Sequence, residues 1–422
     1  MYNFLVLLVL YLPFQLAINP MAGVDLASIR IVILVFLGAW LAQGLKNKNI
    51  MIKNSAQTWL VASFLFLNAF SLIMAKNADW SARKLLFLFS IFPIYFVASQ
   101  AVSNKKRLLG IADTMVLGGA IVAIIGLVQF AAQFIFGLET TYAFWAEYMT
   151  VPFLGKSFGA AVLENPSWLV GISGQTYLRA TSLFPDPHMF SFYLGLLVPL
   201  AIGLMLRQKR RRWLAISALG VIFLADILTF SRGGYLGLVA GLIFMGILSW
   251  QRINKPSKIA VGVILGLSLL VLAIPSPVSQ RFFSSFNLKE GSNQGRLAMW
   301  HKAAEVIAEN PLAGVGIGNY PLEVKPTAVY RDPIYAHNTY LDIAVETGVL
   351  NALVWIGILG ATFRGFWEKS KKENLFFFGL ASLVIFAAHS LVETAIYSPV
   401  VLTLFLVIIS WNNFELSDEK NI

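Results

Sequence analysis

The sequence alternates long apolar runs with short polar segments. A helix that crosses a membrane needs about 20 mostly apolar residues, and twelve runs approach or exceed that length. They cover residues 2–19, 26–45, 56–75, 84–102, 108–136, 187–206, 213–230, 233–250, 259–275, 338–363, 374–392 and 397–413. The pattern predicts an all-α polytopic membrane protein, a single membrane domain over residues 1–422 with about twelve transmembrane helices.

The composition narrows the class of protein further. Hydrophobic residues make up 58% of the 422 residues and charged residues 13%, and the mean hydropathy is +0.72. A soluble globular chain carries about 45–50% apolar and 25% charged residues, so an ordinary soluble enzyme is excluded. The chain has no cysteine, which excludes disulfides, thiolate metal sites and cysteine nucleophiles.

The positions of lysine and arginine predict which way the helices face, because cytoplasmic loops carry an excess of both. With the N-terminus inside, five inner loops hold eighteen of the 32 basic residues: three in 46–55, three in 104–107, five in 207–213, three in 251–258 and four in 364–373. This asymmetry predicts that both termini are cytoplasmic. The run RQKRRR at 207–212 is interpreted as an anchor facing anionic lipid, so no nucleic-acid partner is expected.

Two predicted outer segments are long: 137–186, between the fifth and sixth runs, and 276–337, between the ninth and tenth. Long loops in compact proteins tend to be functional. In the second segment four apolar residues recur at helical spacing: Leu297, Trp300, Ala304 and Ile307. A helix is expected over about 294–309, with Asn293 as its cap and Asn310 before a proline at its end.

Alternate glycines follow that helix at 314, 316 and 318. Glycine without a side chain permits tight backbone turns or close approach of a ligand. We therefore expect the function to lie on the outer face.

Four residues at this face carry candidate chemistry: Arg179, Arg232, Arg296 and His337. Guanidinium groups stay charged and bind phosphate oxygens through paired hydrogen bonds, so several of them together suit an anionic headgroup such as a diphosphate. A histidine there is able to accept a proton near neutral pH.

These residues also have purely structural interpretations. A single arginine at the interface often snorkels or binds a lipid phosphate. Arg232 is harder to explain in this way, because it interrupts two apolar runs with almost no loop around it. His337 would suit a helix cap, a task that Asn338 also suits. Glu346 is either a packed, hydrogen-bonded helix residue or a functional acid.

No metal or cofactor is predicted. The remaining histidines, His188, His301 and His389, have no spacing typical of a metal site. Walker-type phosphate loops, Rossmann fingerprints and HExxH motifs do not occur in the sequence.

Four motifs in order carry a family resemblance: SRGG at 231–234, GRLAMW at 295–300, NPLAGVGIGNY at 310–320 and HNTYLDIAVETG at 337–348. Together they resemble the O-antigen ligase and polymerase superfamily of bacterial membrane glycosyltransferases. The order and spacing match over roughly 179–360, and the layout of twelve spans with a large outer loop before the tenth matches over the whole chain.

The resemblance implies a GT-C-like helical fold in the bacterial inner membrane, with its active site on the periplasmic face. It implies an inverting, metal-independent transfer of a glycan from undecaprenyl diphosphate to an acceptor sugar, lipid A–core in the ligases. By similarity, Arg232 and Arg296 would bind the donor diphosphate, with Arg179 as a third contact. His337 would deprotonate the acceptor hydroxyl. Asn338, Tyr340 and Glu346 are expected supporting residues.

The sequence leaves several functions open, including a protein-glycosylating enzyme of the same superfamily. A ligase is favoured, because the histidine lies at the junction of loop and span and is followed by Asn338. A chain polymerase of the same superfamily is close behind. A lipid-linked glycan transporter is the alternative from another class, although transporters place binding residues near the bilayer midplane, often within repeats, and no paired repeat is found here.

Overall fold

The computed structural model describes residues 1–21, 23–48, 50, 52–164, 167–207, 212–252, 255–330 and 332–415. Residues 208–211 of the basic run therefore lie outside the described residues. The described chain is mostly α-helical, with two small antiparallel hairpins.

The first half of the chain holds most of the short elements. In order they are α1 (Tyr2–Tyr11), η1 (Leu12–Phe14), β1 (Ala17–Met21), β2 (Val24–Ala27), α2 (Ser28–Lys46), α3 (Ala56–Phe70), η2 (Ser71–Met74), α4 (Ala78–Ile91), α5 (Pro93–Ala101), α6 (Lys105–Phe136), α7 (Leu138–Phe144), η3 (Trp145–Met149), α8 (Thr150–Leu154), α9 (Lys156–Glu164), β3 (Leu169–Ile172) and β4 (Gln175–Leu178).

The second half is almost entirely helical. Its elements are α10 (Pro187–Arg207), α11 (Arg212–Leu228), α12 (Arg232–Arg252), α13 (Lys255–Ala273), α14 (Pro277–Phe283), η4 (Ser284–Phe286), α15 (Gly291–Glu309), α16 (Tyr320–Val324), α17 (Thr339–Thr347), α18 (Val349–Lys369), α19 (Asn374–His389), α20 (Pro399–Ser410) and η5 (Trp411–Asn413).

Six helices in the described chain are long and apolar enough to cross a membrane, and a bent pair formed by α13 with the helices after it would make a seventh. The six are Ser28–Lys46, Ala56–Met74, Ala78–Ala101, Lys105–Phe136, Pro187–Arg207 and Val349–Lys369. Each of the twelve apolar runs contains a helix, but several of these helices are shorter than the run that predicted them. The fold is therefore that of an all-α membrane protein.

Several of the apolar runs are interrupted, among them 2–19 and 338–363. The run 2–19 is helical only to Phe14, and its last residues enter strand β1. The run 338–363 is divided at Gly348, whose φ of 91° ends α17 before α18 begins. At Gly348 a side chain would collide with the backbone of the loop at Leu312, so only glycine permits this close crossing.

The core is built around α10 and α20, which are buried along nearly their whole length. Helix α10 packs against α6, α11, α12 and α19, and α20 packs against α5 and α10. Large apolar side chains on the surrounding helices are instead exposed, among them Ile73, Ile135, Phe136 and Ile247. Such an exposed apolar belt is costly in water and is typical of helices that face lipid.

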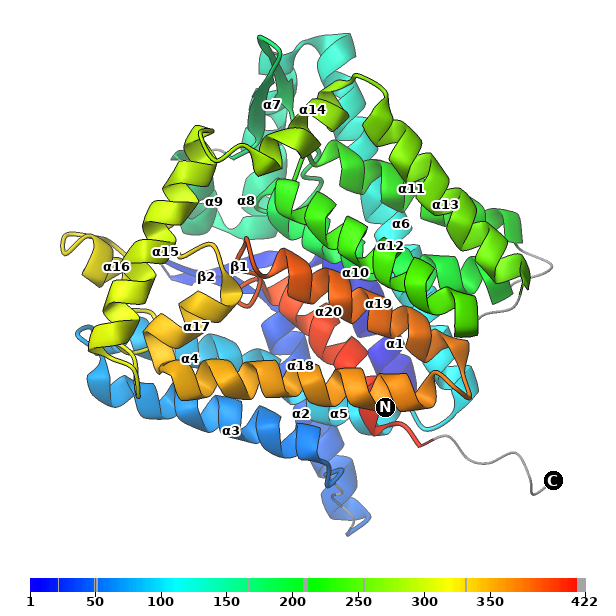
Figure 1. Cartoon of the computed structure of the whole chain (residues 1–422). Helices are drawn as coiled ribbons and strands as arrows, with labels where there is room; N and C mark the ends of the chain where they lie inside the picture. Colours follow the sequence, from blue (N-terminus) through cyan, green and yellow to red (C-terminus); the bar gives the residue numbers. More distant parts are fainter. Residues whose placement is uncertain are drawn as a thin grey trace, which may run out of the picture.

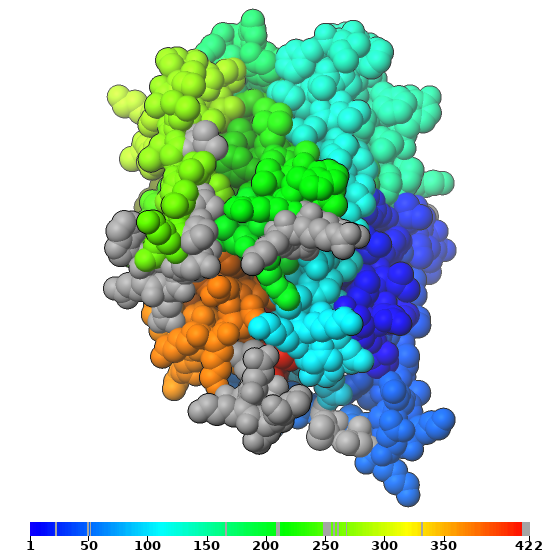
Figure 2. Space-filling model, turned by 90° about the vertical axis from the view of Figure 1, so that its right-hand side faces the viewer, coloured from blue at the N-terminus to red at the C-terminus, as the bar shows by residue number. Residues whose placement is uncertain are grey.

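The helices α14, α15 and α16 lie along the upper and left edges of Figure 1, and the N-terminus lies in its lower part. In Figure 2 the first helices (blue), α6 (cyan) and α11–α13 (green) form one continuous surface, from which the end of α2 projects at the bottom. The helices α14–α16 and the N-terminus thus occupy different sides of the molecule.

The loop helix α15 begins at Gly291, three residues before the expected start. Asn293 is not its cap. The Glu290 carboxylate accepts the backbone N–H of Asn293 at 3.3 Å, while the Asn293 amide donates to the carbonyl groups of Ser284 and Asn287 at 3.1 and 2.8 Å. The helix ends at Glu309, one residue before the predicted stop.

The glycine loop 314–318 has positive φ at each of its three glycines. A Cβ at Gly314 would meet the backbone of α17 at Glu346, and one at Gly316 would meet the backbone of Ala75. The glycines therefore allow the loop to pack against the protein's own backbone at these two positions.

Candidate active site

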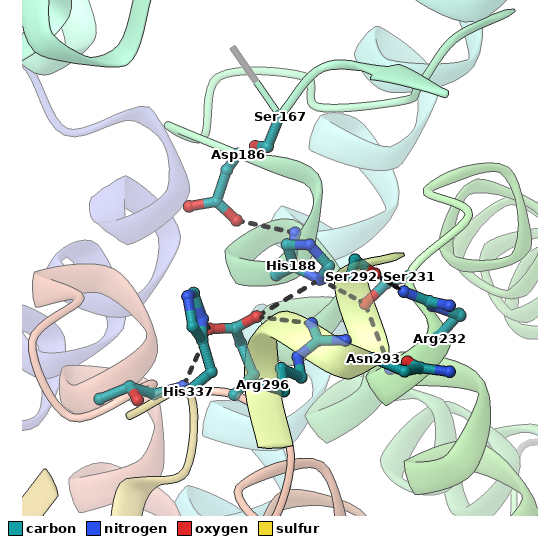
Figure 3. A network of polar contacts seen from close by, with 12 residues as sticks. Ser167, Asp186, His188, Ser231, Arg232, Ser292, Asn293, Arg296 and His337 are labelled. Atoms are coloured by element: carbon teal, nitrogen blue, oxygen red, sulfur yellow. Dashed lines mark hydrogen bonds and ion pairs between the residues drawn. The ribbon is translucent and has the colours of Figure 1, made fainter. Parts of the chain in front are cut away.

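The centre of the site is Glu393, in the loop between α19 and α20. Its carboxylate oxygens lie 2.8 Å from Nδ1 of His337, 3.3 Å from Nη2 of Arg296 and 3.8 Å from Nδ1 of His188. The three partners come from the segment before α17, from α15 and from α10, and Figure 3 shows their side chains converging. The fold thus gathers an acid, two histidines and an arginine that are remote in sequence.

Backbone hydrogen bonds of the residues before and after His337 fix its position. The backbone N–H of Ala336 donates to Asp342 Oδ1 at 2.8 Å, and the backbone N–H of Thr339 donates to the Ser390 carbonyl at 2.9 Å. His337 itself has a φ of 50°, a left-handed conformation that is strained for a residue with a side chain and that clusters at functional sites. The imidazole is therefore positioned by a rigid frame.

The electrostatics of the pair favour a charged imidazole. The negative charge of Glu393, which outweighs the effect of burial, raises the pKa of His337 above its ordinary value. Burial opposes ionisation of Glu393, but the charge of His337 and its hydrogen bond hold the pKa of that carboxyl well below its usual range. Both pKa shifts reflect the attraction between His337 and Glu393.

The geometry also selects a tautomer of His337. Because the carboxylate of Glu393 accepts from Nδ1–H, the neutral imidazole presents the lone pair of Nε2. The side chain of His337 is 38% exposed, whereas that of Glu393 is 9% exposed. This arrangement suits a general base whose other ring nitrogen is oriented by a carboxylate.

Arg232, the first residue of α12, lies next to this cluster with its side chain 4% exposed. Its Nη1 lies 2.6 Å from Glu290 Oε2, and its Nη2 contacts the hydroxyl of Ser292. Arg296 is one turn beyond Ser292 on α15, on the same face of the helix. The first turns of α15 therefore bring Arg232 and Arg296 to the same region as Glu393.

Arg179 is buried and makes local contacts. Its Nε donates to the Thr229 carbonyl at 2.7 Å and its Nη1 to the Ser167 carbonyl at 2.9 Å. Nη2 has no partner among the described residues. Burial, and then the charge of Arg281, lowers the pKa of Arg179 to about 9. Arg179 thus joins the segment before β3 to the α11–α12 turn.

The supporting residues differ in position. Asn338 caps α17, accepting the backbone N–H of Tyr340 at 3.0 Å. The Tyr340 hydroxyl donates to the Ala387 carbonyl at 3.0 Å. Glu346 forms an ion pair with Lys84 at 2.7 Å. Of these three, only Asn338 adjoins His337 in the chain, and Glu346 belongs to a separate buried ion pair.

Two central residues escaped the sequence analysis. Glu393 lies in the short gap between the runs 374–392 and 397–413, where an acid beside membrane segments is itself a functional signal. His188 was considered only as a metal ligand, whereas its Nδ1 lies 3.0 Å from the Ser231 hydroxyl. Neither Glu393 nor His188 belongs to a sequence motif from which its partner in the site could be predicted.

The described residues contain no group of three or more histidine, aspartate or glutamate side chains arranged to hold a metal ion. The positive charges that converge at the centre belong to arginines. The site is therefore equipped to bind an anion and to move a proton.

Comparison with known proteins found similarity over part of the chain. Residues 222–356 match the family model described as O-antigen ligase. Over this segment the chain is similar to the O-antigen ligase family. The match includes Arg232, Arg296 and His337, while Arg179 and Glu393 lie outside it.

Two curated relatives agree with this assignment. An O-antigen ligase of Salmonella typhimurium is 31% identical over 189 residues, which cover 40% of this chain and 44% of that relative. The exopolysaccharide production protein ExoQ of Rhizobium meliloti is 24% identical over 400 residues, 88% of this chain and 80% of the relative. The chain thus aligns with less than half of the Salmonella protein and with most of ExoQ. These similarities, together with the apolar helices, indicate a membrane protein related in sequence to these two proteins.

Proposed function

We propose that this protein is an O-antigen ligase-like inverting glycosyltransferase. It moves a glycan from undecaprenyl diphosphate to an acceptor sugar, lipid A–core, at the periplasmic face of the bacterial inner membrane. The proposal includes a GT-C-like fold of about twelve spans with both termini in the cytoplasm. The observation that carries it is the contact of His337 with a buried carboxylate, beside Arg232 and Arg296.

In this proposal His337 is the general base. Nε2 takes the proton of the acceptor hydroxyl as its oxygen attacks the anomeric carbon. The bond from that carbon to the diphosphate breaks, and its electron pair stays on the diphosphate oxygen. Glu393 stabilises the imidazolium that forms, because its carboxylate already faces Nδ1 at 2.8 Å. An oriented base of this kind contributes about 10²–10⁴-fold to a rate.

The arginines would stabilise the leaving group. Negative charge grows on the diphosphate as the anomeric bond breaks, so preorganised donors there bind the transition state more tightly than the ground state. Arg232 and Arg296 are the proposed donors. Arg179 is a proposed third contact through Nη2, since its other nitrogens bind backbone carbonyl groups.

A polysaccharide polymerase is the second candidate. It is favoured by one observation: the alignment with the exopolysaccharide production protein covers 80% of that relative, against 44% for the O-antigen ligase. The chemistry at His337 would be the same, and the acceptor would be the end of another glycan chain. The two candidates therefore differ only in what supplies the hydroxyl.

The test uses purified protein in liposomes with an undecaprenyl-diphosphate glycan, in EDTA. Lipid A–core, a free glycan chain and water are offered separately, and the products are identified by mass spectrometry. The wild type is compared with His337→Ala and with His301→Ala, a matched control on the exposed side of α15.

We expect transfer to lipid A–core that falls about 10²–10⁴-fold in His337→Ala and is retained in His301→Ala. Transfer to the glycan chain alone would favour the polymerase. Full activity of His337→Ala, or an absolute need for a divalent metal, would overturn the mechanism. If no acceptor leads to release of carrier diphosphate, the transferase is refuted in favour of a transporter, the alternative from another class.

A further inference from the structure

A single carboxylate bridges two arginines at the edge of the site. Glu290 Oε2 lies 2.6 Å from Nη1 of Arg232, and Glu290 Oε1 lies 3.9 Å from Nη1 of Arg281. Arg281 belongs to α14, and none of the sequence motifs includes it. Two guanidinium groups that hold the two oxygens of one anion form a site for a tetrahedral oxyanion as well, because phosphate offers the same paired acceptors.

Backbone carbonyl groups of the α11–α12 turn orient Arg281 and Arg179. The Phe230 carbonyl accepts Nε of Arg281 at 3.3 Å, and the preceding Thr229 carbonyl accepts Nε of Arg179 at 2.7 Å. Arg232 is the second residue after Phe230. Three guanidinium groups therefore originate at or bind to one turn, and Nη1 of Arg281 lies 3.9 Å from Glu290 Oε1.

The guanidinium groups at this turn outnumber the carboxylates that pair with them. The side chains of Arg232 and Arg281 are 4% and 16% exposed, and Glu290 provides the carboxylate in the ion pairs recorded for both among the described residues. Arg296 faces Glu393, which is already paired with His337. A buried excess of positive charge is unfavourable, so a second anion, or one with more charge, would be stabilised here.

Glu290 is also more exposed than Arg232 and Arg281. Its side chain is 30% exposed, against 4% for Arg232. It caps α15 and receives the Ser292 hydroxyl at 3.0 Å. A carboxylate in this position is able to turn toward water when a stronger anion arrives, at the cost of a cap and of its ion pairs with Arg232 and Arg281.

We propose that Glu290 is a built-in counter-ion that occupies the place of the donor diphosphate, and that Arg281 binds this diphosphate together with Arg232. The identity of the anion rests on the proposed function, whereas the anion site itself does not. The incoming diphosphate displaces the carboxylate of Glu290 and binds the guanidinium groups of Arg232 and Arg281 in its place. Glu290 therefore weakens donor binding and keeps the arginines in their binding arrangement before the donor arrives.

The experiment measures binding without transfer. The full-length protein in phosphatidylcholine nanodiscs is titrated with undecaprenyl diphosphate that carries no glycan, and bound lipid is quantified by native mass spectrometry. Phosphatidylglycerol is titrated in a parallel arm to separate a diphosphate site from general binding of anionic lipid. Thermal unfolding of each variant establishes that it is folded.

Two substitutions act in opposite directions. Glu290→Gln removes the competing charge but keeps an oxygen for the α15 cap, so the affinity for undecaprenyl diphosphate should rise about three- to tenfold. Arg281→Gln should weaken binding by about tenfold or more, and Arg281→Lys should recover only part of the loss because the paired geometry is missing. In the double variant Glu290→Gln/Arg281→Gln the gain from Glu290→Gln should shrink, because the two residues share one site.

Lys302→Gln and Glu305→Gln are the matched controls. Both residues lie on the exposed part of α15, where they pair with each other at 3.4 Å. They alter the net charge as Arg281→Gln and Glu290→Gln do, and binding should stay within twofold of the wild type. If a control changes the binding affinity as much as the site variant with the same change of charge, the effect arises from net charge alone and the proposal is overturned.

Unchanged or weaker diphosphate binding in folded Glu290→Gln would refute the role of Glu290. Binding within twofold of the wild type in Arg281→Gln would refute the role of Arg281, and equal affinity for phosphatidylglycerol would refute a diphosphate site. These results do not depend on catalysis. A protein that binds undecaprenyl diphosphate as described but transfers no glycan would refute the proposed function alone.

Discussion

Replacing Glu393 by glutamine removes the charge that faces His337 while it keeps the size of the side chain. The Glu393 Oε1–His337 Nδ1 distance is 2.8 Å and the carboxylate is nearly buried. Glutamine still offers an oxygen to Nδ1–H, so the loss is the difference between a charged and a neutral hydrogen bond, about 1–2 kcal/mol. That difference corresponds to roughly a five- to thirtyfold lower rate at the optimal pH.

The pH profile gives an independent readout. His337 must be neutral to accept a proton, so activity is lost as the pH falls through its pKa. Because the charge of Glu393 raises this pKa, the acid limb of the wild type should lie above the ordinary value for histidine. Glu393→Gln removes the cause of the upward shift, so its acid limb should move to lower pH. The variant is therefore most impaired at high pH and least impaired at low pH.

The assay is the liposome transfer reaction, followed at saturating donor from acidic to alkaline pH. Glu323→Gln is the matched control, since Glu323 pairs with Lys76 at 2.6 Å and does not contact His337. An acid limb that stays in place in Glu393→Gln, together with a plateau within twofold of the wild type, would refute the assignment of Glu393 as the partner that positions the base.

Three further predictions concern stability, measured by thermal unfolding in detergent. Arg179→Met should lower the unfolding free energy by about 2–4 kcal/mol because two charged hydrogen bonds to buried carbonyl groups are lost, and an unchanged midpoint would contradict this role. Lys84→Met should lower the free energy of unfolding by about 3–5 kcal/mol, because the buried Glu346 carboxylate loses its cation while it keeps the hydrogen bond from the Tyr397 hydroxyl at 2.6 Å. The double replacement of Lys84 and Glu346 by Met should recover most of that loss, and a larger loss would refute the explanation. Gly348→Ala should lower the free energy of unfolding by about 1–3 kcal/mol, because φ at this position is 91° and the new Cβ would collide with the backbone of Leu312. Gly360→Ala, in open space on α18, should be neutral or stabilising, and equal effects at the two glycines would contradict the argument.

The sequence alone predicted the class of the fold and singled out candidate residues for its chemistry. Apolar runs specify membrane helices because each helix satisfies its own backbone hydrogen bonds, and this property is local. The helix after residue 290 was also predictable, since its apolar spacing is contained within five turns. Arg232, Arg296 and His337 stood out because a permanent charge or a titratable group at the edge of an apolar run is unusual and costly.

The number of spans and the ends of helices were less predictable. An apolar run has the same composition whether it continues as one helix or bends, so the division at Gly348 depends on the loop that packs against it. The cap of α15 illustrates the same limit. Asparagine is the better cap by local preference, but Glu290 takes the position because Asn293 is used to hold the preceding turn.

The partners of the site residues were decided only by the tertiary structure. Glu393 is 56 residues from His337 and 97 from Arg296, and Glu290 is 58 residues from Arg232. No local pattern specifies which acid meets which base across such separations, because the pairing depends on how the helices pack. The sequence therefore determined which side chains are able to bind an anion or move a proton. The packing of α10, α12, α15 and the α19–α20 loop decided that these side chains lie together, with one carboxylate beside the histidine and another between two arginines.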